Sequence, residues 1–173
     1  MKRDAALICL SREHHDGLVL SLRIARELPE AGAGAVEALY TDLLEFWEQA
    51  LLRHFRAESE CLLARLVRHV DLEDEMVRRT EADHLRLAAL IADMKDTSDT
   101  AIRSDRMAAF GEVLRDHIRW EEERLFDATQ RIMAKAEMRA LGRELEERLP
   151  PLCFPALYGE REAGSPGDQT LSG

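Results

Sequence analysis

Histidines and glutamates are the residues of this chain best suited to chemistry, and four of them form two pairs with the same spacing. His54 precedes Glu58 in the sequence His-Phe-Arg-Ala-Glu, and His117 precedes Glu121 in His-Ile-Arg-Trp-Glu. Residues four positions apart lie on one helix face about one turn apart. Each pair can therefore direct a ring nitrogen and a carboxylate oxygen toward one point, as a metal ion requires.

Two further histidines, His15 and His84, lie on other stretches with helical periodicity. In antiparallel helices joined by short turns, two neighbouring histidines meet if they lie equally far from the turn that joins them. At roughly 1.5 Å per residue, the mismatch within each neighbouring pair is at most about 10 Å. We therefore expect all four imidazoles to fall in one layer of a helical bundle.

The adjacent residues His14 and His15 point about 100° apart on a helix, so only one of them can face the interior. The residues three, four and seven positions further on are Leu18, Val19 and Leu22 for His15, and Gly17, Leu18 and Ser21 for His14. Because the apolar set is typical of a buried face, we predict that His15 points inward. His14 is then solvated or lies behind the ligands.

The two glutamates strengthen the prediction of a metal site. Burial of Glu58 and Glu121 on apolar helix faces costs free energy unless a cation compensates their charge. Imidazole and carboxylate together suit borderline metals such as Fe(II), Fe(III), Mn(II) or Zn(II). Two glutamates can bridge two ions, each with two histidines and open positions for a small ligand. The alternative is a hydrogen-bonded polar layer without metal. The candidate ligands are His15, His54, Glu58, His84, His117 and Glu121.

The elements that carry these residues are long amphipathic helices, which predict an all-α fold. The expected architecture is an up-down-up-down four-helix bundle with a short C-terminal fifth helix and a flexible tail. The third helix follows an N-cap at Asp71 and ends before Asp96. We expect one domain over residues 1–149 and an extended or disordered tail over residues 150–173. The other helices are expected at about residues 6–28, 35–69, 101–133 and 136–148.

The composition excludes several classes of partner. A formal charge of −10 argues against nucleic acid and anionic membrane, and no apolar run is long enough to cross a bilayer. The N-terminal residues are expected to begin a helix, because no small-residue cleavage site of a signal peptide follows them. Cys9, Cys61 and Cys153 form no Cys-x-x-Cys motif, so we expect no disulfide framework and a cytoplasmic location.

The combined motifs resemble those of the hemerythrin-like, or HHE, family of four-helix-bundle proteins over roughly residues 7–130. The resemblance implies a non-haem centre of two iron ions, held by the candidate ligands above, with open positions for O₂, NO or peroxide. Oxygen-carrying members have a further histidine one turn before the one on the third helix. Here that position is Thr80, with Glu81 beside it. The resemblance therefore argues against reversible oxygen carriage. Four histidines with two glutamates is instead the ligand set of the bacterial di-iron proteins that repair iron–sulfur clusters.

Three functions remain open. The first is a di-iron protein that binds O₂, NO or peroxide in sensing, storage or stress response. The second is an enzyme that repairs iron–sulfur clusters or reduces NO or peroxide at the same centre, with Glu81, Glu122 or Tyr40 in support. The third is a helical interaction module, with another metal or none, that docks a protein through apolar faces of the fifth helix or through Leu152 to Tyr158. No protein partner can be named, and a homodimer through the outer helices is compatible with the sequence.

Overall fold

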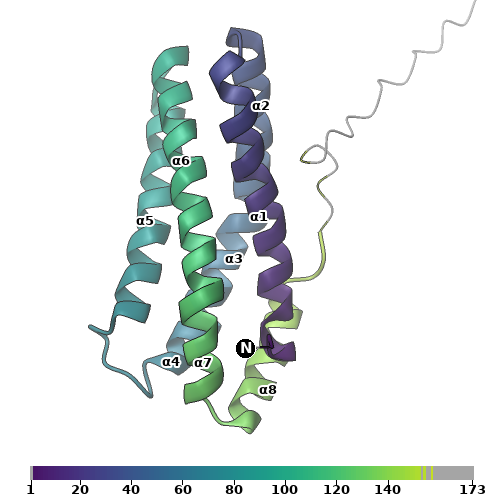
Figure 1. Cartoon of the computed structure of the whole chain (residues 1–173), viewed down its shortest axis with the longest axis vertical. Helices are drawn as coiled ribbons and strands as arrows, with labels where there is room; N and C mark the ends of the chain where they lie inside the picture. The colour runs from purple at the N-terminus through teal and green to yellow at the C-terminus, as the bar shows by residue number, and fades with distance from the viewer. Residues whose placement is uncertain (1, 153, 155–156, 158–173) are drawn as a thin grey trace, which may run out of the picture.

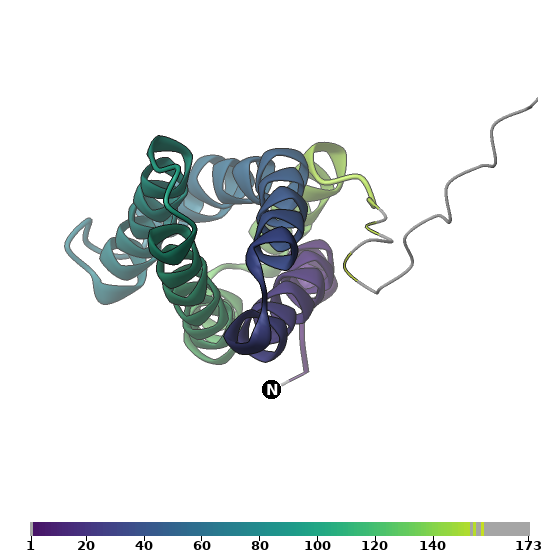
Figure 2. The ribbon, with the colours of Figure 1, turned by 90° about the horizontal axis from the view of Figure 1, so that it is seen from above.

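The computed structural model describes residues 2–152, 154 and 157, and it contains only helices and turns within that part of the chain. The predicted all-α class is confirmed. Figure 1 shows the long helices running side by side along the longest axis, and Figure 2 shows them arranged around a common centre. The α-helices are α1 (Ile8–Glu27), α2 (Ala33–Phe46), α3 (Leu52–Ala57), α4 (Ala64–Leu66), α5 (Glu75–Asp96), α6 (Thr100–Trp120), α7 (Phe126–Ile132) and α8 (Lys135–Arg148).

Three π-helical segments join shorter α-helices into longer continuous ones. The first two link α2, α3 and α4, which together form the single helix that the sequence predicts there. The third links α6 to α7, which accounts for the other long predicted helix. A π segment carries wider i→i+5 hydrogen bonds and is often found at functional sites. The segments are Trp47–Leu51, Glu58–Leu63 and Glu121–Leu125.

Aspartates cap the N-termini of α5 and α6. Asp99 accepts hydrogen bonds from the backbone N–H groups of Ala101 and Ile102, which start α6. Asp74 accepts one from the N–H of Met76, which starts α5. The predicted N-cap at Asp71 is therefore wrong by one turn, because that side chain binds within the preceding turn instead.

The helix α1 is buried along a stripe with spacings of three and four residues, but one position earlier than predicted. Leu22, which was expected inside, is 65% exposed, and Ile8 is 52% exposed. Small residues on the true stripe let α1 approach α6 closely: a Cβ added to Gly17 would lie 2.8 Å from Ile118 Cδ1. The buried stripe consists of Leu7, Leu10, His14, Gly17, Ser21, Ile24 and Leu28.

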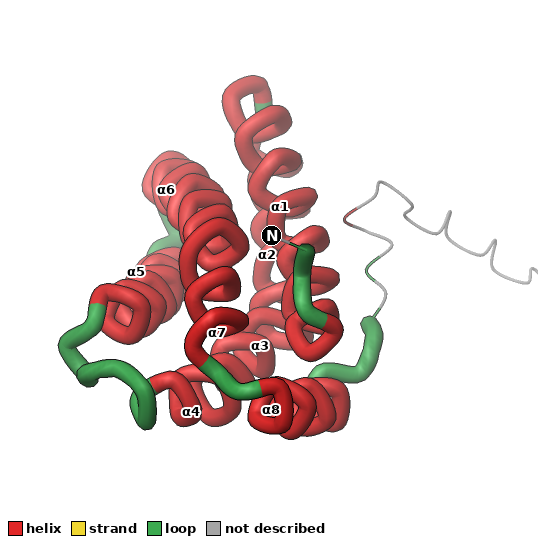
Figure 3. Tube along the Cα trace, turned by 60° about the horizontal axis from the view of Figure 1, so that its bottom comes forward, coloured by secondary structure: helices red, strands yellow, loops and turns green. Residues whose placement is uncertain are grey.

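The apolar core is divided into two clusters. One contains residues of α1 after Leu20, α2, and the facing parts of α5 and α6. The other contains the start of α1, the π segment after Ala57, α7 and α8. The helix α8 lies across the end of the molecule at which α4 and α7 stop (Figure 3). Each long helix therefore passes from one cluster to the other, and the candidate ligands lie at that boundary.

The chain after α8 returns along the helices. Phe154 and Leu157 belong to the first apolar cluster, and the Phe154 ring packs edge-on against Phe46 with centroids 5.0 Å apart. Residues 153, 155–156 and 158–173 of the predicted tail lie outside the described residues, as does Cys153. Across the described residues, none of the helices combines the length and the apolar character that crossing a bilayer demands.

Candidate metal centre

Four histidines and two glutamates meet between the two apolar clusters. Five of them are predicted candidates, and all five are buried: His54 is 2% exposed, His84 8%, His117 1%, and both Glu58 and Glu121 0%. The sixth prediction is wrong in orientation. His15 is exposed, whereas His14, at 4% exposure, contributes the imidazole from α1.

The six side chains divide into two overlapping groups that could each hold a metal ion. Within each group, one donor atom per residue lies within 4.8 Å of all the others. Both groups include the same two glutamates and differ in their histidines. The first group consists of His14, His54, Glu58 and Glu121, and the second of Glu58, His84, His117 and Glu121.

The carboxylates lie between the two pairs of histidines. Glu58 directs Oε1 to within 3.3 Å of His54 Nε2 and Oε2 to within 3.2 Å of His84 Nε2. Glu121 Oε2 lies 3.2 Å from His14 Nε2 and 3.3 Å from His117 Nε2. Each glutamate therefore contacts one histidine from each pair, as a bridging ligand must.

Most of these buried donor atoms lack a hydrogen bond. Both carboxylate oxygens of Glu58 and of Glu121 make none within the described chain, and neither does Nε2 of His84 or of His117. Buried polar atoms are normally hydrogen-bonded, since an unsatisfied one costs about 1–3 kcal/mol. Buried nitrogen and oxygen donors that converge with so few hydrogen bonds fit a cation, and the donor set suits iron, manganese or zinc.

Comparison with known families agrees with this geometry. Residues 8–129 match the family described as the Hemerythrin HHE cation binding domain. The chain belongs to this family. No curated protein and no solved structure matches the chain. Family membership implies cation binding, and all six converging residues of this hemerythrin-family chain lie within the matched range.

Carboxylates behind the histidines orient the rings. His14 Nδ1 donates to Glu122 Oε1 at 2.8 Å, and His54 Nδ1 donates to Glu13 Oε2 at 2.9 Å. When Nδ1 carries the proton, the Nε2 lone pair is free to bind a metal. These two contacts therefore hold two imidazoles of the hemerythrin-family centre in the form that coordinates.

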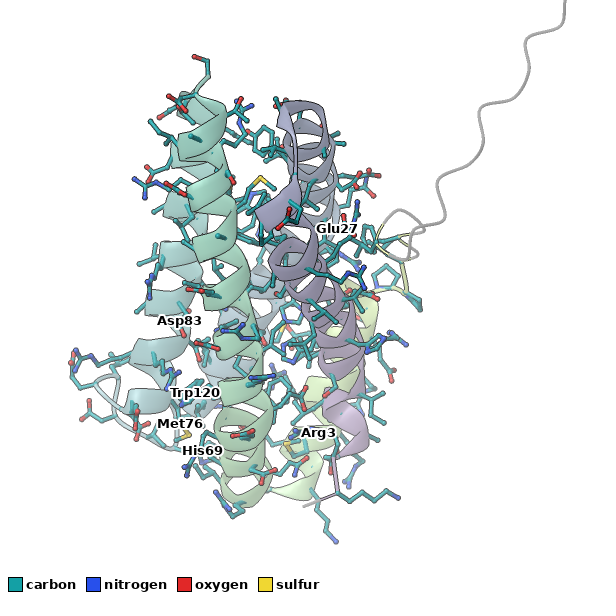
Figure 4. The ribbon with its side chains drawn as sticks, turned by 45° about the horizontal axis from the view of Figure 1, so that its top comes forward. Arg3, Glu27, His69, Met76, Asp83 and Trp120 are labelled. Atoms are coloured by element: carbon teal, nitrogen blue, oxygen red, sulfur yellow. The ribbon has the colours of Figure 1, made fainter. Side chains whose placement is uncertain are left out.

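A third carboxylate, Asp83, lies 3.6 Å from His117 Nδ1 (Figure 4). Each of the three acidic residues is adjacent in sequence to a ligand candidate on its own helix but contacts a histidine of another helix. Glu13 belongs to α1 yet contacts His54 of α3, and Glu122 belongs to the third π segment yet contacts His14 of α1. Sequence reasoning placed Glu122 among possible supporting residues and missed Glu13 and Asp83.

The two buried glutamates have opposite pKa shifts. Burial raises the pKa of Glu121 well above its usual value, and the nearby Glu58 charge adds to the shift. Burial also disfavours ionised Glu58, but the charge and hydrogen-bonding capacity of His54 outweigh it and lower the pKa of Glu58 well below its usual value. Without metal, the protein therefore stabilises one carboxylate charge of the pair at the expense of the other.

Each glutamate is the first residue of a π segment: Glu58 begins the second and Glu121 the third. The preceding histidines lie in regular α-helix, in α3 and at the end of α6. Both His-x-x-x-Glu motifs thus have the same local backbone, with regular helix up to the glutamate and a widened turn after it. Sequence periodicity gave no signal of these turns.

The side chains of Thr80, Glu81 and Tyr40 make their contacts away from the six converging residues. The Thr80 hydroxyl donates to the backbone carbonyl of Met76 at 2.9 Å, and Glu81 accepts a hydrogen bond from the Ser59 hydroxyl at 2.7 Å. Tyr40 packs instead under the guanidinium of Arg103 in the first apolar cluster.

Proposed function

We propose that this hemerythrin-family chain is a non-haem di-iron protein that binds O₂, NO or peroxide in sensing, storage or stress response. One observation carries the proposal: two buried glutamates are shared by two pairs of histidines. A single ion would need only one of these groups, whereas two overlapping groups suit two ions with common carboxylate ligands. The proposed architecture is the up-down-up-down four-helix bundle with a fifth helix, which the helix order supports.

The proposed ligand set differs from the sequence prediction at one position. His14 replaces His15, and His54, Glu58, His84, His117 and Glu121 are kept. The iron pair would supply open coordination positions and redox capacity for a small ligand. The chain would supply the nitrogen and oxygen donors and the apolar clusters that exclude bulk water.

The surroundings of Thr80 support a centre with four histidines. Its hydroxyl is engaged by the Met76 carbonyl, and the chain offers only His84 as a ring donor from α5. A pocket of about 200 Å³ between α5 and α6 includes His117 in its lining, which suits access by a small molecule. The buried free thiols of Cys9 and Cys61 are consistent with the proposed cytoplasmic location.

Metal analysis of adjacent variants tests the proposal. The full chain is loaded with Fe(II) without oxygen, desalted, and analysed for iron by mass spectrometry and Mössbauer spectroscopy. We expect two irons per chain in the unmodified protein and in His15→Ala, and a clear loss in His14→Ala. One iron or none in the unmodified protein, or equal iron in both variants, would contradict the ligand set.

Addition of each ligand then separates binding from turnover. A stable optical change on addition of O₂, NO or peroxide to the iron-loaded protein supports a binding or sensing function. Rapid consumption of NO or peroxide would instead indicate an enzyme at the same centre.

A further inference from the structure

Three of the four buried histidines rest on a carboxylate that is itself paired with an arginine. In each case the contacts lead from a buried histidine to a more exposed arginine. The three chains of contact are His14–Glu122–Arg3, His54–Glu13–Arg53 and His117–Asp83–Arg79.

The contacts behind the first histidine pair are close and numerous. Glu122 accepts from His14 at 2.8 Å and from Arg3 at 2.5 Å, and Arg3 also donates to the Glu122 carbonyl at 2.6 Å. Glu13 accepts from His54 at 2.9 Å and from Arg53 through its other oxygen. Both imidazoles of this pair are therefore held in position by a carboxylate at Nδ1.

The contacts behind the second pair are longer or absent. Asp83 lies 3.6 Å from His117 Nδ1 and 3.7 Å from Arg79, distances beyond a hydrogen bond. Among the described residues, the carboxylate contact of His84 is made through Nε2 and none is made through Nδ1, and its ring stacks on Phe55 with centroids 4.0 Å apart. Stacking restrains the ring plane but does not select which nitrogen carries the proton.

We propose that the two metal positions are unequal: the position of His14 and His54 binds its ion tightly and fills first, and the position of His84 and His117 exchanges its ion. The inference rests on the proposed binuclear function. Hydrogen-bonded partners behind metal ligands typically contribute about 10–100-fold in metal affinity. Glu58 and Glu121 serve both positions, so they cannot produce this difference. Glu13 and Glu122 are then positioning residues for the tight position.

Solvent access favours the same assignment. His117 and Asp83 both line the pocket of about 200 Å³ between α5 and α6, together with Arg79 and Arg86. A metal ion bound by His84 and His117 would therefore have this pocket beside one of its ligands. The tight position is also tied to both terminal segments, through Arg3 and through Arg53, which donates to the Pro150 carbonyl at 3.2 Å.

Stepwise titration with Co(II) tests the inference on the full-length apoprotein. Binding is followed by calorimetry and by the visible d–d absorption of bound Co(II), which reports on the ligand geometry. We expect two steps whose dissociation constants differ by about 10–100-fold. Glu13→Gln and Glu122→Gln should each weaken the first step by about 10–100-fold and change its spectrum. His84→Ala should abolish the second step and keep the first.

Matched variants show whether the effect belongs to the positioning contacts. Glu123→Gln removes the same charge from an exposed residue next to Glu122 and should leave both steps unchanged. Glu13→Asp, which keeps the carboxylate, should recover part of the first-step affinity that Glu13→Gln loses.

The outcomes distinguish this inference from the proposed function. Two steps of equal affinity, or a Glu13→Gln and Glu122→Gln effect on the second step only, overturn the inequality and leave a binuclear centre standing. Binding of one Co(II) or none overturns the proposed function and this inference with it. If one glutamine variant does not fold, the other still decides the result.

Discussion

Replacement of Glu121 by glutamine tests whether the two metal positions share ligands. The side chain is fully buried, and its Oε2 contacts a histidine of each pair at 3.2 and 3.3 Å. Glutamine has nearly the same shape but lacks the charge and one of the two acceptor oxygens. We expect loss of metal binding at both positions, because the same carboxylate belongs to both groups.

The size of the effect follows from ligand linkage. At a free metal concentration 100 times the dissociation constant of the weaker position, each occupied position adds at least about 2.7 kcal/mol to the free energy of unfolding, so the two positions add at least about 5 kcal/mol. For a chain of this size, that gain raises Tm by about 10–20 °C. A 100-fold loss of affinity leaves about 0.4 kcal/mol at the weaker position, so the rise in Tm due to that position falls to about 1–2 °C.

Thermal unfolding followed by circular dichroism, with and without added metal, measures these shifts. Glu123→Gln is the matched control, since it is exposed, lies two residues away and loses the same charge. It should keep the full metal-dependent rise in Tm. A Glu121→Gln protein that retained more than half of that rise would refute the shared-ligand arrangement, and a rise of about half would assign Glu121 to one position only.

Three further substitutions test the packing that positions the centre, each measured as the free energy of unfolding in urea. Gly17→Val should cost about 1–3 kcal/mol, because its Cβ would lie 2.8 Å from a buried isoleucine on α6. Gly142→Val should cost about 3 kcal/mol, because its Cβ would lie 2.9 Å from the backbone of Ala6, which cannot move aside as a side chain can. Phe154→Ala should cost about 3 kcal/mol through loss of a buried ring, whereas Leu152→Ala, at a site 42% exposed, should change stability by less than about 0.5 kcal/mol.

The helices could be predicted from the sequence because their apolar periodicity is long and regular. The predicted fifth helix at 136–148 differs by one residue from Lys135–Arg148. The start of α5 was harder to predict, since Asp71 and Asp74 are both suitable N-caps and lie one turn apart. The backbone resolves the choice: Asp71 binds the N–H of Glu73 within a turn, and Asp74 binds the N–H of Met76.

The error at His14 and His15 has a physical cause in helix packing. Apolar periodicity counts large side chains, and the residues that follow His14 on its face are Gly17 and Ser21. These residues are buried because α6 lies close to α1 there, where Gly111 also faces Ile24 at 3.3 Å from an added Cβ. The buried face of α1 therefore lacks large apolar residues where it contacts α6, and its sequence pattern resembles that of an exposed face.

The carboxylates behind the histidines were missed for a different reason. Glu13 and Asp83 are adjacent to ligand candidates in sequence, but each contacts a histidine on another helix. A single helix pattern predicts which residues share a face and gives no information on contacts between helices. The shared glutamates, in contrast, could be predicted, because each lies four residues from a histidine on its own helix.

The widened turns that begin at Glu58 and Glu121 make the centre sensitive to chain length as well as to residue type. A π turn accommodates an additional residue over nearly the same rise as an α turn, so removal of one residue between 59 and 63 can convert that turn to regular helix. The apolar cluster that contains α7 and α8 would keep its orientation, and only the backbone immediately beyond Glu58 would tighten. Insertion or deletion of a single residue in these turns can therefore alter the centre even when all six candidate ligands are kept.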